Sequence, residues 1–174
     1  MKILETKRLI LRYFTLDDAP FMLELLNTPT WLQYIGDRNV HTLEDAENYL
    51  RNGSLKSYEE HGFGFYAVIE KAETSDRKNQ PIGLCGITKR DTLPDVDIGF
   101  AFMPNLLSKG FGYEAASATL DYALNTLKIS RIIAIVSPDN EKSIGLIKKI
   151  GLVFEKMIKS GDENKELMLF GINS

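Results

Sequence analysis

The sequence predicts an α/β fold of the α+β type, in which a mixed β-sheet is covered by helices. Short β-rich runs and amphipathic helical runs follow one another in the order β, α, α, β, β, β, α, β, α, β, β. The run 131–136 is almost entirely apolar, as in strands buried on both faces. Helices packed on a sheet bury both patterns. The 174 residues show no linker or repeat and are expected to form one domain, 1–174.

The first quarter of the chain contains one strand signal and two helix signals. Residues 8–14 are β-rich and partly alternating, which predicts a strand. The runs 16–27 and 42–52 each begin at a capping box and are predicted to be helices. Residues 30–40, between these helices, are expected to be irregular.

Three further strands are predicted in the middle of the chain. They cover residues 63–70, 82–89 and 95–103. The polar, charged run 71–81 is expected to be a solvated hairpin loop, and a turn is expected around Pro94.

In the last third of the chain, helices and strands alternate. Apolar residues at helical spacing predict helices, and β-rich apolar runs predict strands. The expected elements are a helix at 113–127, a strand at 131–136, a helix at 141–150, and two closing strands at 152–159 and 165–172 joined by 160–162.

The composition predicts a cytoplasmic protein without nucleic-acid or membrane partners. A net charge of −3 gives no basic surplus for either. No run approaches the roughly 18 apolar residues of a membrane span, and the N-terminus lacks a signal core. The single cysteine, Cys85, fits a reducing compartment and a buried strand position. His41 and His61 have no ligand-spaced partner, so no metal site is expected.

Gly110 and Gly112 form a possible phosphate cradle between a strand and a helix. Glycine lets the backbone approach a ligand, and a helix start offers unpaired N–H groups to an anion. Lys109 adds a cation. The alternative is a tight turn before a helix. A dinucleotide fingerprint is excluded because Glu114 and Ala115 follow where a third glycine would be needed.

A second polar segment, 138–143, precedes the short helix and then Gly151. Its proline, acidic and amide residues are typical of a loop that clamps a ligand. Together, the cradle and this segment predict a site for a long, thin, phosphorylated cofactor.

The two segments resemble a known pair of motifs. The runs 97–104 and 107–115 resemble the acetyl-CoA motif of the GNAT N-acetyltransferase superfamily, Q/R-x-x-G-x-G/A. The run 140–152, with Asn140, Ser143 and Gly151, resembles its partner motif. The opening run 5–12 is similar to the start of the RimJ/RimL-like branch, which includes acetyltransferases of ribosomal-protein N-termini.

The resemblance implies a mostly antiparallel GNAT sheet whose fourth strand splays from the fifth, with acetyl-CoA in the gap and no metal. Backbone groups of Phe102 and Met103 should bind the pantetheine arm. Asn140 should hydrogen-bond that arm, and Ser143 should face the thioester sulfur. The amides that should hold the pyrophosphate are those of Ser108, Lys109, Gly110, Phe111, Gly112 and Tyr113.

Three positions depart from the family pattern. Leu107 stands in place of the usual glutamine or arginine, and Tyr113 stands where a small hydroxyl residue is common. Many relatives place a tyrosine acid at the position of Ile147, so that acid is absent here.

Acetyl transfer needs an oxyanion donor, a stabilised leaving group and a base. The backbone N–H of Phe102 or its neighbour is the expected oxyanion donor. Ser143 is predicted to donate a hydrogen bond to the departing thiolate, or else to be a polar residue in a helical turn. Asp97 is predicted to act as the base through a water, or else to be a solvent-facing strand residue. A weak base can deprotonate an α-amine, with a pKa of about 8, more easily than a lysine side chain, with a pKa of about 10.4.

The region 30–40 is implied to border the acceptor pocket. Trp31 and Tyr34 would form an aromatic wall, and Asp37 would attract a cationic amine, although Trp31 is equally suited to the core. The predicted function is transfer from acetyl-CoA to a protein or peptide N-terminal α-amine by direct attack in a ternary complex. The alternatives are a small-molecule amine acetyltransferase, for a polyamine, amino acid or antibiotic, and a non-catalytic acyl-CoA sensor. The closing strands leave homodimer pairing open.

Overall fold

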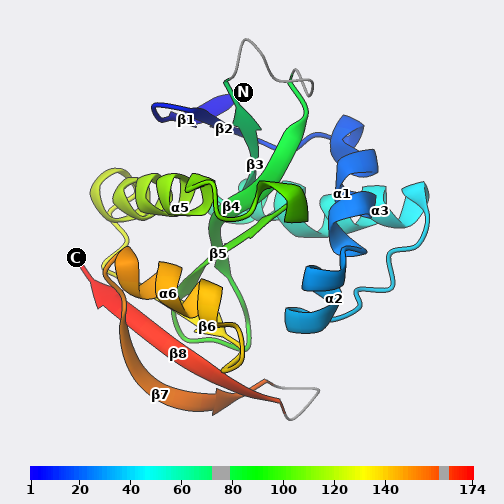
Figure 1. Cartoon of the computed structure of the whole chain (residues 1–174). Coiled ribbons are helices and arrows are strands. Elements are labelled where there is room, and N and C mark those ends of the chain that lie inside the picture. Colours follow the sequence, from blue (N-terminus) through cyan, green and yellow to red (C-terminus); the bar gives the residue numbers. More distant parts are fainter. Residues whose placement is uncertain (72–78, 161–164) are drawn as a thin grey trace.

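The computed structural model describes residues 1–71, 79–160 and 165–174, and within them eight strands form one sheet (Figure 1). The strands are β1 (Lys2–Glu5), β2 (Leu9–Arg12), β3 (Phe65–Glu70), β4 (Pro81–Lys89), β5 (Val96–Phe102), β6 (Arg131–Val136), β7 (Val153–Lys159) and β8 (Glu166–Asn173). They are hydrogen-bonded in the order β1–β2–β3–β4–β5–β6–β8–β7. All neighbours are antiparallel except β5 and β6, which confirms the predicted mixed, mostly antiparallel sheet.

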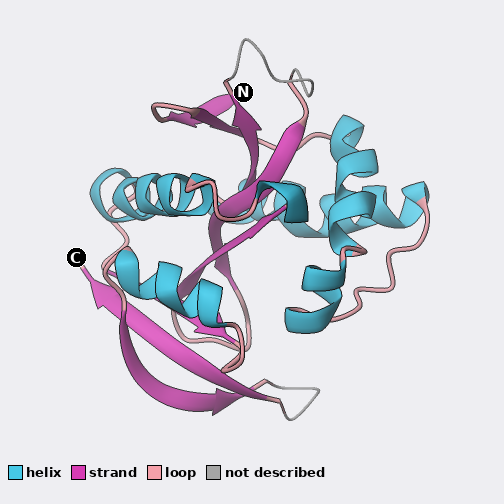
Figure 2. Ribbon diagram, in the orientation of Figure 1, coloured by secondary structure: helices cyan, strands magenta, loops and turns pink. Residues whose placement is uncertain are grey.

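Helices cover both faces of the sheet (Figure 2). They are α1 (Ala19–Leu26), α2 (Pro29–Tyr34), α3 (Leu43–Leu50), α4 (Lys56–His61), α5 (Phe111–Asp121) and α6 (Glu141–Lys149). A wider helical turn at Arg51–Leu55 joins α3 to α4, and another at Tyr122–Thr126 extends α5. No helix in the described part of the chain is long and apolar enough to span a membrane.

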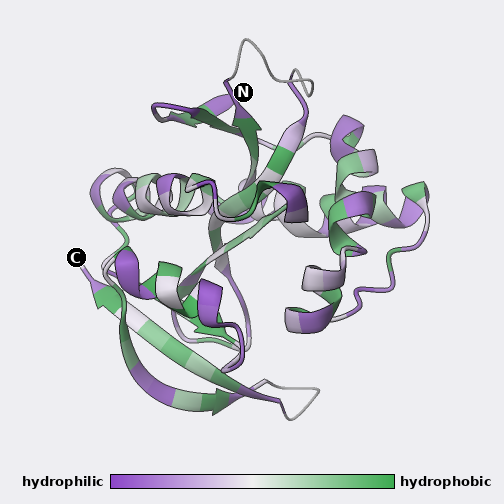
Figure 3. Ribbon diagram, in the orientation of Figure 1, coloured by the Kyte–Doolittle hydropathy of each residue, from purple (hydrophilic) through white to green (hydrophobic). Residues whose placement is uncertain are grey.

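The alternation of side chains along β3 divides the core between these two helical layers. Ala67 and Ile69 pack in the cluster formed with α1 and α3, whereas Tyr66 and Val68 pack against α5. The strand β4 is buried on both faces over most of its length and appears predominantly hydrophobic in Figure 3. A third cluster joins β6, β8, α5 and α6.

Three elements differ from the sequence-based expectations. Residues 30–40 are not wholly irregular, because α2 begins where α1 ends. Pro29 occupies the first turn of α2, and the Thr28 side chain accepts a hydrogen bond from the Trp31 N–H. The strand β1 was not predicted, and the second helix continues as far as His61. Most of the predicted hairpin loop, 72–78, and part of the 160–162 link lie outside the described residues.

The strands β5 and β6, the fourth and fifth of the family pattern, separate soon after they meet. Parallel pairing joins only Val96 to Ile132 and Asp97 to Ile133. Beyond this point β5 stays paired to β4, while β6 stays paired to β8 along its whole length. The splayed strand pair is therefore confirmed, and it opens directly above Asp97.

Candidate active site

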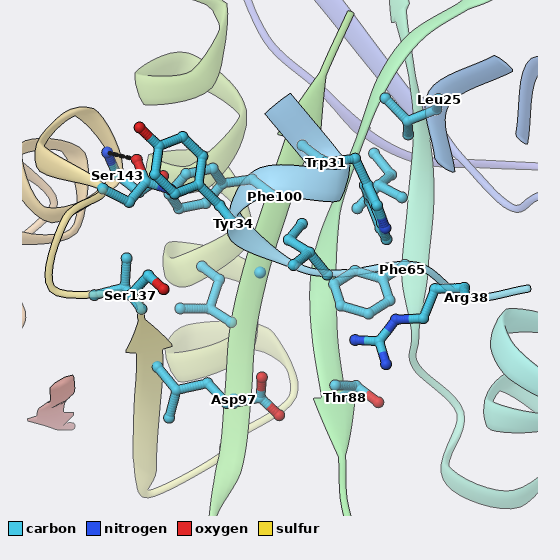
Figure 4. A pocket seen from close by; sticks show the side chains of 18 of the residues that line it. Leu25, Trp31, Tyr34, Arg38, Phe65, Thr88, Asp97, Phe100, Ser137 and Ser143 are labelled. Carbon is cyan, nitrogen blue, oxygen red and sulfur yellow. Dashed lines mark hydrogen bonds between the residues drawn. The ribbon is translucent and has the colours of Figure 1, made fainter. Parts of the chain in front are cut away.

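One continuous cavity of about 1700 Å³ connects the α5 cradle, the gap between β5 and β6, and the helix α2. Asp97, Phe100, Ser137 and Ser143 surround the gap side of this cavity in Figure 4, and Trp31, Tyr34 and Arg38 come from the α2 side. The cavity therefore brings together the two motifs and the 30–40 region, although they are far apart in the sequence.

The backbone of β5 presents two residues to the gap. The Met103 N–H donates to the Ile82 carbonyl of β4 (3.0 Å), and the ladder pairs Gly83 with Phe102. Successive strand residues direct their N–H and C=O groups to opposite edges, so those of Phe100 and Phe102 are directed toward β6. This arrangement is compatible with the role predicted for Phe102, and it adds Phe100, which the sequence analysis missed.

The prediction for Met103 is wrong at its N–H, because that group belongs to the β4–β5 ladder. The Met103 carbonyl in turn accepts from the Leu106 N–H (2.9 Å). Strand register, which no motif encodes, decides which of two adjacent residues faces the ligand.

The cradle has the positive backbone angles that the glycine pattern suggested. Ser108 has φ 65°, and Gly110, at the N-cap of α5, has φ 81°. A side chain is strained in this left-handed region, which explains glycine at position 110. Gly112 serves helix packing, since an added Cβ would lie 3.1 Å from Leu146 of α6. The amides at the start of α5 are positioned to hold an anion.

The cradle is anchored to the N-terminal hairpin by a contact that the sequence analysis missed. Glu114 accepts hydrogen bonds from the Arg8 N–H (2.7 Å), Arg8 Nε (2.7 Å) and Thr6 Oγ1 (2.6 Å). Arg8 also donates to the Lys109 carbonyl (2.9 Å) and stacks over the Phe111 ring. Burial would raise the pKa of Glu114, but the hydrogen bonds from Thr6 and Arg8 outweigh it and lower that pKa. Glu114, one residue before the position where a dinucleotide fingerprint would have its third glycine, thus anchors the cradle to the hairpin.

The polar segment after β6 forms the first turn of α6. The Asn140 Oδ1 accepts from the Ser143 N–H (3.2 Å) as the helix N-cap, which leaves the Asn140 Nδ2 to donate to a ligand. Ser143 lines the cavity. Ile147, at the position of the family tyrosine, is buried in the core.

Ser137, at the end of β6, is a further residue that the sequence analysis missed. Its hydroxyl is buried and has no hydrogen-bond partner among the described residues, although the residue lines the cavity. A buried unpaired hydroxyl is costly, so a ligand in the gap would supply the partner that this group lacks.

Asp97 is buried at the point where β5 and β6 part, with 1% of its surface exposed. The solvent-facing alternative is therefore wrong. Arg90 Nε lies 3.0 Å and 3.3 Å from the two carboxylate oxygens. Burial raises the pKa of Asp97, and the charge of Arg90 offsets only part of that rise. A carboxylate with a raised pKa is a better base than a free aspartate.

The 30–40 region contributes a different set of groups from the one predicted. Trp31 belongs to the buried core and also lines the cavity. Tyr34 lines the cavity. Asp37 does not: it is exposed, accepts from the Asn39 N–H (2.7 Å) and lies 3.8 Å from His41. The neighbouring Arg38 extends into the cavity instead (Figure 4).

Cys85 has no role in the chemistry. The Cys85 thiol is fully buried beside Thr119, and burial raises its pKa to about 12, so it is no nucleophile. The Tyr113 ring is partly exposed with Lys149 above it (4.4 Å to the centroid). Among residues 1–71, 79–160 and 165–174, no group of three or more histidine, cysteine or acidic side chains could hold a metal ion.

Comparison with known proteins identifies the class that this fold and cavity define. The family described as "Acetyltransferase (GNAT) domain" matches residues 8–153, so the chain belongs to the GNAT acetyltransferases. The uncharacterized N-acetyltransferase YnaD of Bacillus subtilis is 32% identical over 162 residues, which cover 91% of this chain and 89% of that protein. The chain is accordingly an acyl-CoA-dependent acetyltransferase.

Solved structures extend the likeness to the whole chain. The GNAT-family acetyltransferase of Bacillus anthracis is 28% identical, with a TM-score of 0.77 and coverage of 99% and 98% of the two chains. The ribosomal-protein-S5-alanine acetyltransferase of Vibrio fischeri has a TM-score of 0.80 at 19% identity, with coverage of 99% and 96%. RimL, a ribosomal L7/L12 α-N-protein acetyltransferase solved with coenzyme A, reaches 0.82 at 15%, with coverage of 99% and 98%. At these last two identities the likeness is one of fold.

Proposed function

We propose that this acetyltransferase transfers the acetyl group of acetyl-CoA to the α-amine of a protein or peptide N-terminus, by direct attack in a ternary complex. The observation that carries the proposal is the parting of β5 and β6 at Asp97. It places a buried carboxylate beside a gap edged by unpaired backbone groups of β5. The RimL and S5-alanine acetyltransferases, whose names specify protein N-termini or ribosomal proteins, share this fold.

In the proposed reaction, acetyl-CoA lies along β5 with its phosphates at the α5 cradle. The N–H groups of Phe100 and Phe102 are the available donors for the carbonyl oxygen as it gains negative charge. One such donor contributes about 100-fold or more in rate. The amine nitrogen bonds to the carbonyl carbon, and the carbon–sulfur bond breaks.

Ser143 stabilises the negative charge and Asp97 accepts the proton that this step releases. The Ser143 hydroxyl donates a hydrogen bond to the departing thiolate, whose conjugate thiol has a pKa of about 8.5 and is a stable leaving group. Asp97 receives the proton from the amine through a water and releases it to solvent. The raised pKa of Asp97 favours this role.

The state of the only thiol supports direct transfer. Cys85 is buried and neutral, so no cysteine in the described part of the chain can carry the acetyl group between the two substrates. A ternary complex then predicts intersecting initial-rate lines when both substrates are varied, whereas a covalent relay gives parallel lines.

The test is acetylation of matched peptides, with mass spectrometry used to locate the acetyl group. One peptide has a free N-terminus and no lysine, and its partner has a blocked N-terminus and one internal lysine. Acetylation of the first peptide alone supports the proposal. Acetylation of the second alone, or of free amines only, overturns the N-terminal assignment while leaving the acetyltransferase activity intact.

A further inference from the structure

The α2 side of the cavity presents an arginine, Arg38, in place of the acidic group, Asp37, that the sequence led us to expect there. Arg38 lines the cavity and forms no ion pair with any described residue. Its guanidinium points between Phe65 and Thr88 in Figure 4. Asp37, which could have neutralised it, lies outside the cavity and is paired with His41.

A second guanidinium faces the same space. Arg90 lines the cavity and contacts Asp97 through Nε alone, so its two terminal nitrogens remain for another partner. Thr88, which lies beside the Arg38 guanidinium in Figure 4, is paired across the β4–β5 ladder with Asp97, the carboxylate that Arg90 contacts. Arg38 and Arg90 therefore lie on the same part of the cavity wall.

An unpaired neutral donor lies on the same wall. The Trp31 Nε1–H is buried and has no acceptor among the described residues. Arginine and indole N–H groups are donors only, so these three donors of one cavity call for an acceptor from a ligand. Planar guanidinium groups bind carboxylates in particular.

The acids on this side do not supply that acceptor. Asp97 is held by Arg90, Asp45 accepts from the backbone at the start of α3, and Glu60 lies 3.6 Å from Lys56. Asp91 also lines the cavity, but it is exposed in the turn after β4 and forms no ion pair with Arg38. The Arg38 guanidinium is therefore left without an ionic partner among the described residues.

From these donors we infer that the acceptor carries a carboxylate close to its amine, and that Arg38, with Arg90 and Trp31, binds it. The inference rests on the proposed acetyl transfer and adds the acceptor's chemical class. Two sources provide this chemistry: the α-carboxylate of a free amino acid, and an acidic side chain beside a peptide N-terminus. The two cations also disfavour a protonated amine in the cavity, which keeps the attacking nitrogen neutral.

Isosteric pairs of acceptors test the inference. One pair is a free amino acid and its amide, and the other is a C-terminally amidated peptide beginning Ser-Glu and its Ser-Gln counterpart. We expect kcat/KM to favour the carboxylate member of at least one pair by about tenfold or more, equal to about 1.4 kcal/mol. The pair that shows the preference identifies the source of the carboxylate.

Two variants with the same change of charge locate the effect. Arg38→Gln should bring the ratio within the preferred pair close to one. Arg51→Gln, at an exposed site that pairs with Glu47 outside the cavity, should keep the wild-type ratio. The ratio compares two acceptors on one enzyme, so a general loss of folded protein does not change it.

The inference is overturned if the wild type shows equal kcat/KM within both pairs, if it prefers the neutral members, or if Arg38→Gln leaves the ratio unchanged. In each of these cases, turnover itself still upholds acetyl transfer. Absence of turnover with every acceptor overturns both the carboxylate inference and the proposed acetyl transfer to these acceptors.

Discussion

Replacing Asp97 with asparagine separates catalysis from stability at one buried position. The substitution keeps the size of the side chain and removes its charge at the point where β5 and β6 part. In the proposed reaction this charge removes the proton from the amine, so Asp97→Asn should lower kcat/KM while acetyl-CoA affinity stays unchanged.

The size of the loss follows from general base catalysis, which contributes about 100- to 10,000-fold. Stability should move differently. Burial raises the pKa of Asp97 above 3.8, so the folded state holds its proton more tightly than the unfolded chain. The ionised carboxylate therefore opposes folding, and this penalty grows as pH rises from 3.8 through the raised pKa. Asp97→Asn should leave stability at neutral pH unchanged or higher.

The assay is a pH–rate profile of kcat/KM beside denaturant unfolding of both proteins. The wild type should show an ascending limb with an apparent pKa above 3.8, and the variant should lack it. A variant with wild-type kcat/KM, or one with the same acidic limb, would refute the role of Asp97. A fall in activity accompanied by a large loss of stability would show that Asp97 is structural.

Three further substitutions test other parts of the site. Glu114→Gln removes the carboxylate that holds Arg8, and we expect a loss of about 2 kcal/mol in unfolding free energy together with weaker acetyl-CoA binding by calorimetry. The pKa of Glu114 is lowered below 4.5, so this stabilisation should be present above pH 4.5 and lost as pH falls through the lowered pKa. A difference in unfolding free energy between wild type and Glu114→Gln that is equal at all pH values would contradict this role of the carboxylate. Ser143→Ala should reduce kcat without changing acetyl-CoA affinity, and an unchanged kcat would end its proposed role. Gly86→Ala would place a Cβ 2.2 Å from the Gly64 carbonyl, so unfolding should be easier by at least about 2 kcal/mol, and a neutral result would contradict the β3–β4 contact.

Some elements could be predicted because their signal is local. The strand β6 was bounded correctly from an apolar run, since burial on both faces needs no knowledge of neighbours. The strained position at Gly110 was likewise visible as a glycine before a helix. The helix α2 stands where an irregular segment is expected, because Pro29, just past the predicted helix 16–27, suits the first turn of a new helix.

The remaining errors depend on three-dimensional proximity. The choice of Phe100 over Met103 follows from strand register, and the contact between Arg8 and Glu114 joins positions 106 residues apart. Asp37 and Arg38 are adjacent in an irregular segment, where no periodicity predicts which one faces the cavity.

Amide hydrogen exchange with and without saturating acetyl-CoA tests the central claim that the cosubstrate lies along β5 in the gap. We expect slower exchange at Phe100 and Phe102 and at the first amides of α5 when acetyl-CoA is bound. Met103 serves as the internal control, because its N–H already donates to Ile82. Unchanged exchange at Phe100 and Phe102 in the complex would contradict the account.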